Sequence, residues 1–154
     1  MNNAYPTKET IVSLCKKLYL PCPDSFEQDW QYVVVDPERI NEFLWLYNND
    51  TSLTDNEKMT LGILILGSLN EALDGGKGIE DTWQASWDIL KQDFHIHANT
   101  LRYWACWNEE DDTNWFPIAR QIRSAIGSYK QSNQIAAAQQ PHAPDQRNRG
   151  DFVD

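Results

Sequence analysis

The chain is 154 residues long, with 41% hydrophobic residues, 23% charged residues and a net charge of −10 at pH 7. This length and composition indicate one soluble globular domain that is large enough to bury a core. A strongly negative chain repels nucleic-acid phosphates, which excludes nucleic acid as a partner and favours a basic protein, although an acidic surface also serves solubility alone.

Three helices are predicted before residue 50. The first covers residues 7–20, where Thr7 is a suitable cap and apolar side chains recur at helical spacing. Residues 24–35 predict a second helix with an irregular end, although the β-branched and aromatic residues 32–35 also favour a strand. The third helix begins at Asp36-Pro37-Glu38, because an acidic cap followed by proline is a strong helix start.

The most apolar helix is predicted between Thr54 and Gly75. Thr54 and Glu57 have the spacing of a capping box, and the glycines after Asp74 can take the left-handed conformation that ends a helix. Its apolar run covers only residues 59–69, against about 20 residues needed to cross a bilayer, so a membrane span is not expected. Apolar side chains cover most of its circumference, so we expect a buried central helix. The side chains expected to be almost fully buried are Leu61, Ile65, Leu66 and Leu69.

The second half of the chain continues the helical pattern. A helix over residues 79–93 is followed by a junction at residues 94–97 and by a helix that Asn99 or Thr100 caps. An acidic loop then precedes a last helix that starts at Phe116-Pro117. The predicted fold is an all-α compact bundle of about six helices around residues 55–74. A single domain is expected over residues 5–130, with a disordered C-terminal tail over residues 131–154.

Catalytic and metal-binding motifs are weak in this sequence. His95 and His97 would point the same way in an extended junction, with Glu109 to Asp112 as further ligands, but a metal site needs three or four convergent groups. The glycine-rich turn at residues 75–78 lacks the phosphate-binding spacing. The acidic run also lacks the calcium-loop order, and no nucleophile elbow occurs. We therefore expect no catalysis, no metal and no cofactor.

Acidic and aromatic residues form the best candidate binding surface. The segment from Asp24 to Asp112 carries 19 acidic and 5 basic side chains, whereas the rest of the chain carries 4 acidic and 8 basic ones. Aromatic anchors rimmed by charge concentrate affinity in protein interfaces, although packing in the core is an equal alternative for the aromatics. The candidate partner-binding residues are Trp107, Glu109, Glu110, Asp111, Asp112, Trp115, Glu80, Asp81 and Asp88.

The three cysteines bear on the cellular compartment. Cys15, Cys22 and Cys106 are an odd number, widely spaced, and include no C-x-x-C pair. This pattern favours free thiols in a reducing environment over a disulfide framework. The N-terminal residues lack an apolar signal core. A cytoplasmic protein is therefore expected.

Several stretches resemble a known class of small acidic bacterial proteins. Residues 36–43, 53–58, 103–104 and 116–118 carry a succession of caps and aromatics that is similar to the immunity proteins of polymorphic-toxin and contact-dependent inhibition systems. The resemblance implies a cytoplasmic protein that blocks a cognate toxin by direct binding, without catalysis. Two alternatives stay open: an enzyme or ligand-binding domain that uses His95, His97 and nearby acids, and a structural, self-associating helical protein.

Overall fold

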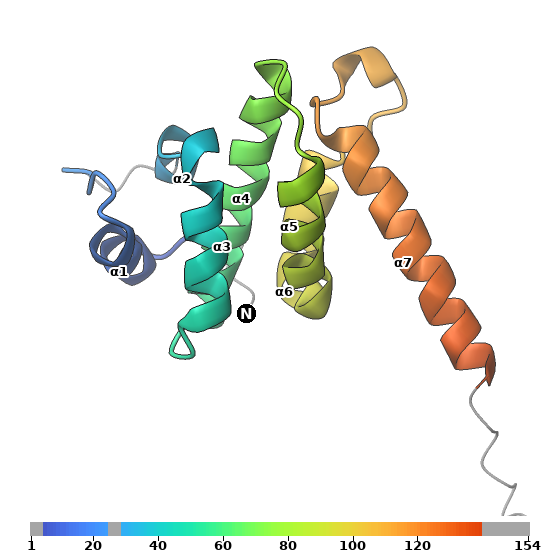
Figure 1. Ribbon diagram of the computed structural model, residues 1–154, viewed down its shortest axis with the longest axis horizontal. Helices are drawn as coiled ribbons and strands as arrows, with labels where there is room; N and C mark the ends of the chain where they lie inside the picture. The colour runs from blue at the N-terminus through green and yellow to red at the C-terminus, as the bar shows by residue number, and fades with distance from the viewer. Residues whose placement is uncertain (1–4, 25–28, 140–154) are drawn as a thin grey trace, which may run out of the picture.

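The computed structural model describes residues 5–24 and 29–139, with side chains up to residue 133, and this part of the chain is all-α. Figure 1 shows the helices packed side by side, with α4 between α3 and the pair α5 and α6. The elements in order are α1 (Lys8–Leu18), α2 (Trp30–Val33), the 3₁₀ turn η1 (Pro37–Arg39), α3 (Ile40–Asn49), α4 (Asp55–Asp74), α5 (Glu80–Gln92), α6 (Phe94–Trp104), the 3₁₀ turn η2 (Asp112–Asn114) and α7 (Ala119–Gln139).

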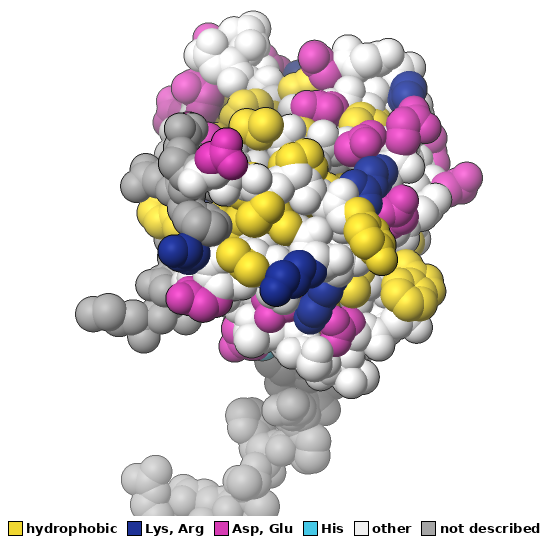
Figure 2. Space-filling model, turned by 90° about the vertical axis from the view of Figure 1, so that its left-hand side faces the viewer, with side chains coloured by type: hydrophobic (Ala, Val, Ile, Leu, Met, Phe, Trp, Pro, Cys, Tyr) yellow, Lys and Arg dark blue, Asp and Glu magenta, His cyan; other side chains and the backbone are white. Residues whose placement is uncertain are grey.

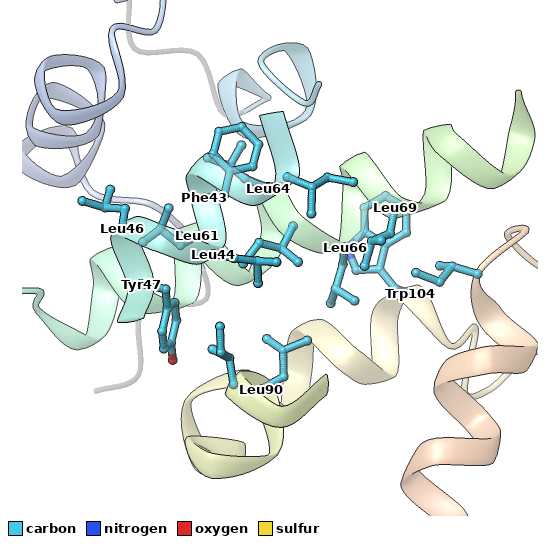
Figure 3. Packing of buried hydrophobic residues seen from close by; sticks show 14 of the residues in the cluster. Phe43, Leu44, Leu46, Tyr47, Leu61, Leu64, Leu66, Leu69, Leu90 and Trp104 are labelled. Atoms are coloured by element: carbon cyan, nitrogen blue, oxygen red, sulfur yellow. The ribbon is translucent and has the colours of Figure 1, made fainter. Parts of the chain in front are cut away.

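Helix α4 is the centre of the bundle, as the sequence predicts. Leu61, Ile65, Leu66 and Leu69 are 0% exposed, and the helix touches α1, α2, α3, α5 and α6. Figure 3 shows side chains of α4 packed among those of α3, α5 and α6, from Phe43 on one side to Trp104 on the other. Within the described residues no helix is long and apolar enough to span a bilayer.

Small residues on α4 let two neighbours approach it closely. A Cβ atom on Gly62 would lie 2.6 Å from Nδ1 of His97 in α6, and one on Gly67 would lie 2.7 Å from Val35. Ser68, also on α4, accepts a hydrogen bond of 3.0 Å from the backbone N–H of Asp36. These small and polar residues of α4 are buried, so they serve packing on several sides of the helix.

The cap of α4 differs in part from the predicted capping box. The Thr54 hydroxyl accepts the backbone N–H of Glu57 at 3.1 Å, as expected. The Glu57 carboxylate, however, pairs with Lys17 of α1 at 3.1 Å, and Lys17 also reaches Asp50 at 2.8 Å. Glu57 is buried, so this pairing supplies the partner that a buried carboxylate needs. The helix cap thus also anchors α1.

Three helices end in the same hydrogen-bonded turn. A backbone N–H donates to the carbonyl five residues earlier in each case: Leu20 to Cys15, Lys77 to Ala72, and Trp107 to Arg102. Such a turn needs one left-handed residue. Gly76 takes this role in α4, as the glycine-rich end predicts, whereas α1 and α6 use Tyr19 (φ 52°) and Cys106 (φ 50°).

Three predicted boundaries need correction. Residues 94–97 are the first turn of α6 and not a junction, so Asn99 and Thr100 lie inside a helix. The helix predicted over residues 24–35 is confirmed only over residues 30–33, and the strand alternative is wrong there. The helix α7 continues to Gln139, so residues 131–139 of the predicted disordered tail are helical, and residues 140–154 lie outside the described part of the chain.

Candidate functional site

The two histidines do not form a site. Because residues 94–97 are helical, side chains two positions apart point in widely different directions. His95 is exposed, whereas His97 is 0% exposed and faces α4. The expectation that both imidazoles point the same way is therefore wrong. In the described residues no three His, Cys, Asp or Glu side chains are placed to hold a metal ion.

His97 belongs to a buried hydrogen-bond network between helices. The Tyr47 hydroxyl lies 2.7 Å from Asp93 Oδ2 and 2.7 Å from His97 Nε2. Since the hydroxyl donates to the carboxylate, the His97 proton is assigned to Nε2, which leaves Nδ1 buried and unpaired among the described residues. The three side chains tie α3 to the start of α6, with Tyr47 and His97 buried and the Asp93 side chain 22% exposed.

Burial decides the protonation states of this network. Burial lowers the pKa of His97 to about 4, and the nearby Asp93 carboxylate only partly opposes this. Burial also raises the pKa of Tyr47, and the hydrogen bond to Asp93 adds to that effect. For Asp93, burial raises the pKa, but the Tyr47 hydroxyl and Lys58 outweigh it and the net shift is downward. The network therefore holds a neutral imidazole, a neutral phenol and a carboxylate at pH 7.

The acidic loop between α6 and α7 is held by a residue that the sequence analysis did not single out. Arg123 of α7 donates hydrogen bonds to the backbone carbonyls of Ala105 (2.7 Å), Cys106 and Glu109 (3.1 Å). Its guanidinium also lies 3.8 Å from the centroid of the Trp115 ring. Several donors on one planar group fix the first part of the loop relative to α7, and the ring contact holds Trp115 near its other end.

Within the loop, some carboxylates support the turn itself. Asp111 accepts the backbone N–H of Thr113 at 3.0 Å and its hydroxyl at 2.8 Å, which lowers the pKa of Asp111. Glu109 accepts the backbone N–H of Asp111 at 3.0 Å, and Asp112 pairs with Arg120 at 2.7 Å. Glu110 is exposed. The loop is therefore a defined turn whose acidic side chains stay at the surface.

The two tryptophans of the loop differ in exposure. Trp107 is 40% exposed, which agrees with its selection as an anchor, and the charged ends of Arg123 and Lys130 lie 5.8 and 5.0 Å from its ring centroid. Trp115 is half-buried and donates from Nε1 to the Glu109 carbonyl at 2.9 Å. Trp115 therefore packs the inside of the loop, and Trp107 is the more available ring.

Further acidic side chains lie at the same end of the bundle as this loop. Figure 1 places the loop, the end of α4 and the start of α5 at one end of the molecule. The backbone N–H of Ile118 donates to Asn70 Oδ1 at 3.2 Å, which joins the start of α7 to α4 there. We call this surface the acidic end, and its exposed carboxylates beyond the loop are Glu71, Asp74, Glu80 and Asp81.

Asp88 is separated from the acidic end. It lies about two turns, or about 12 Å, farther along α5 than Glu80. There it pairs with Lys91 at 3.2 Å and accepts a hydrogen bond from Gln84 at 3.0 Å. The structure thus groups Glu80 and Asp81, but not Asp88, with the loop.

The face of the molecule over α1 has a mixed composition. Figure 2 shows hydrophobic, acidic and basic side chains side by side on it, with many of the acidic ones towards its upper end.

A groove of about 560 Å³ runs along α4 and α6, away from the loop carboxylates. It is lined by aromatic and polar side chains, and the six that characterise it are Tyr5, Tyr32, Asn56, His95, Tyr103 and Trp104. Indole Nε1 of Trp104 is buried and without a hydrogen-bond partner in the described part of the chain. His97 does not line the groove, so the two histidines do not converge there.

Sequence reasoning missed the residues that organise the acidic end. Arg123 and Arg120 lie on the last helix, for which the sequence predicted only an apolar stripe. Asn70 is a polar residue of α4 for which the sequence predicted no contact. One available signal was the i, i+3 spacing of Arg120 and Arg123, directly after an acidic and aromatic loop. Opposite charges in adjacent segments predict that the loop folds back onto the helix.

Comparisons with models of known protein families, with characterised protein sequences and with solved structures found no match to this chain. The geometry of the acidic end and of the groove is therefore what bears on function.

Proposed function

We propose that this chain is an acidic protein-binding module that neutralises a basic protein by covering its working surface. The most specific form of the proposal is an immunity protein that inhibits a cognate bacterial toxin domain, such as a nuclease, inside the cytoplasm. Inhibition by occlusion needs no catalysis by the inhibitor, so the chain acts as a ligand of its target and not as an enzyme.

The observation that carries this proposal is the ordered presentation of the acidic loop. Arg123 binds the loop through backbone carbonyls, so it fixes the loop without pairing with the carboxylates. Glu110 remains exposed, as do Glu71, Asp74, Glu80 and Asp81 at the same end. Binding costs less free energy when the binding loop is already ordered, because less conformational entropy is lost.

Charge at the acidic end has a second consequence for a basic partner. Complementary charge steers two proteins towards each other and raises the association rate, and added salt weakens this effect. Trp107, which is partly exposed beside the loop, supplies an aromatic surface for the contact itself. The expected complex therefore forms fast at low salt and dissociates slowly.

The test measures binding of the product of the gene adjacent to the one that encodes this chain. Neutralising three exposed acids, with Glu80→Gln, Asp81→Asn and Glu110→Gln combined, should lower the association rate at least about tenfold at low salt. The matched control neutralises three exposed acids on the α1 and α3 side, with Glu9→Gln, Asp24→Asn and Glu42→Gln combined. Equal loss in both triple variants, or unchanged association in the first, would contradict the proposal.

The groove favours a second candidate function, the binding of a small ligand. Pockets of about 300–1,000 Å³ with a few convergent polar groups are typical of ligand sites. Ligand-observed NMR with small aromatic and polar fragments, repeated with Tyr103→Ala, would detect such a site. Fragment binding to the wild-type protein that is lost in Tyr103→Ala would favour ligand binding at the groove. No fragment binding to the wild-type protein would contradict this second candidate function.

A self-associating structural protein stays a third prediction, which molecular mass in solution tests.

A further inference from the structure

The turn that ends α1 brings two cysteines together. Tyr19 takes the left-handed conformation, and the backbone N–H of Leu20 donates to the Cys15 carbonyl at 3.1 Å. The chain therefore reverses and runs back along the last turn of the helix. The carbonyl of Pro21, the residue before Cys22, accepts a hydrogen bond from the Cys15 thiol at 3.6 Å.

The reversed segment is also held from the other side. The Pro21 carbonyl accepts a second hydrogen bond, of 3.0 Å, from Nε1 of the buried Trp30. The Cys15 thiol therefore lies against the backbone of the residue directly before Cys22, which brings the two cysteines close together. The pKa of Cys15 is raised by burial first and by the neighbouring Cys22 second. This proximity is set by the fold, although six residues separate the cysteines and the sequence alone favours free thiols.

The two thiols differ in accessibility in the way that thiol–disulfide exchange requires. Cys22 is exposed and can meet a dissolved disulfide, whereas Cys15 is buried. The third cysteine, Cys106, accepts a hydrogen bond from the backbone N–H of Phe116 at 3.4 Å and belongs to the turn after α6. A surface thiol close to a buried one is the arrangement of an attacking and a resolving cysteine.

We propose that Cys15 and Cys22 form a reversible intramolecular disulfide, with a small-molecule disulfide such as oxidised glutathione as the oxidant. The Cys22 thiolate attacks one sulfur of the oxidant, which releases one reduced glutathione and leaves a mixed disulfide on Cys22. The Cys15 thiol then loses its proton and attacks Sγ of Cys22. The second glutathione leaves and takes up that proton, so two protein thiols are oxidised and one disulfide is reduced.

The bond would fix the turn that joins α1 to the rest of the molecule. It closes a short loop around Tyr19, which is 91% exposed. A cross-link of this kind restricts the unfolded chain and so stabilises the folded one. Burial raises the pKa of Cys15 to about 12, so we expect closure of the bond to accelerate as the pH rises.

The test exposes the full-length protein to excess oxidised glutathione and follows its mass. Lys16 and Lys17 lie between the two cysteines, so trypsin separates them into different peptides, which stay linked only through a disulfide. Wild type should lose two hydrogens without retaining glutathione, and should yield the linked peptides. Reduction should restore the original mass. Cys106→Ser should behave as wild type, since Cys106 takes no part.

Variants at the two cysteines separate the steps. Cys15→Ala should retain one glutathionyl group on Cys22, and wild type should lose that group at least about tenfold faster. Cys22→Ser, an exposed position that leaves the core unchanged, should yield no linked peptide. A stable mixed disulfide on wild type would overturn the proposal. Linkage through Cys106, or no oxidation of the folded protein, would overturn it as well.

Discussion

Two clusters of polar and aromatic side chains lie against the central helix, and they use their charges in opposite ways. In the buried network, Tyr47 joins His97 to Asp93, and the hydrogen-bonding groups face one another. At the acidic end, Arg123 binds backbone carbonyls and the face of Trp115. The first cluster uses its polar groups for packing. The second cluster uses one cation to order a loop, and the carboxylates of that loop stay at the surface.

This difference shows why residue type alone misplaces the site. A His-x-His pair near acidic residues is typical of metal chemistry, yet here one imidazole is buried in the core and the other is exposed. An acidic run is typical of a solvated, mobile loop, yet here it is fixed at several points. The histidine pair, whose residue types suggest chemistry, serves packing. The acidic loop, whose composition suggests only a solvated segment, is the ordered surface on which the proposed binding rests.

The largest expected effect concerns the packing that supports both clusters. Leu66→Ala removes a side chain that is 0% exposed, and should lower the free energy of unfolding by about 2–5 kcal/mol. Urea unfolding monitored by circular dichroism measures it. Glu71→Ala, at an exposed position on the same helix, should change stability by less than about 0.5 kcal/mol. Similar small effects at both positions would contradict the central placement of α4.

The buried cluster predicts a pH dependence of stability. The pKa of His97 is lowered to about 4 in the folded protein, so the unfolded chain binds a proton more readily between that value and the ordinary 6.5. Stability is therefore complete above pH 6.5 and is lost as the pH falls towards 4, by about 3 kcal/mol in all. The measurement is urea unfolding at several pH values in this window.

The histidine variants isolate this effect from other titrating groups. His97→Gln should be less stable at pH 7 but should lose less of its remaining stability between pH 6.5 and 4. His95→Gln, at an exposed position on the same helix, should keep the wild-type pH dependence. If His97→Gln and wild type show parallel curves, His97 is not the group that responds.

Helix starts were the most predictable features of the fold. Thr7, Thr54 and the Asp36-Pro37 pair all occupy the positions that their side chains favour, because capping is a local interaction within a few residues. The burial of Leu66 and its neighbours was also predictable, since a helix that is apolar on most sides needs neighbours on most sides. These features depend on local sequence or on hydrophobic pattern.

Features set by tertiary contacts were not predictable in the same way. The first turn of α6 has no capping side chain, so nothing local indicated that residues 94–97 are helical. Tyr19 and Cys106 take left-handed conformations that glycine usually supplies, and sequence rules look for glycine at such positions. The contacts of Arg123 cross between segments up to 18 residues apart, so the order of the acidic loop was not evident.

A smaller effect should distinguish an ordered acidic loop from a loosely attached one. Arg123→Lys keeps the charge but cannot donate to several carbonyls from a planar group, so stability should fall by about 1–2 kcal/mol. Amide hydrogen exchange in residues 105–115 should accelerate, while exchange in α4 stays slow. Arg120→Lys, at an exposed position one turn earlier, should leave the loop protected. Equal acceleration in both variants would mean that Arg123 has no special role.

The smallest expected effect tests the helix on which the acidic end rests. Gly127 lies on α7 between Arg123 and Lys130, and a Cβ atom there would meet nothing within 4 Å. Alanine is better than glycine inside a helix, so Gly127→Ala should raise the free energy of unfolding by about 0.5–1 kcal/mol. Thermal unfolding measures this gain, and Trp107 fluorescence should stay unchanged because the new methyl group reaches no ring. A loss of stability would contradict the open space around Gly127, and with it the placement of α7 beside the acidic loop.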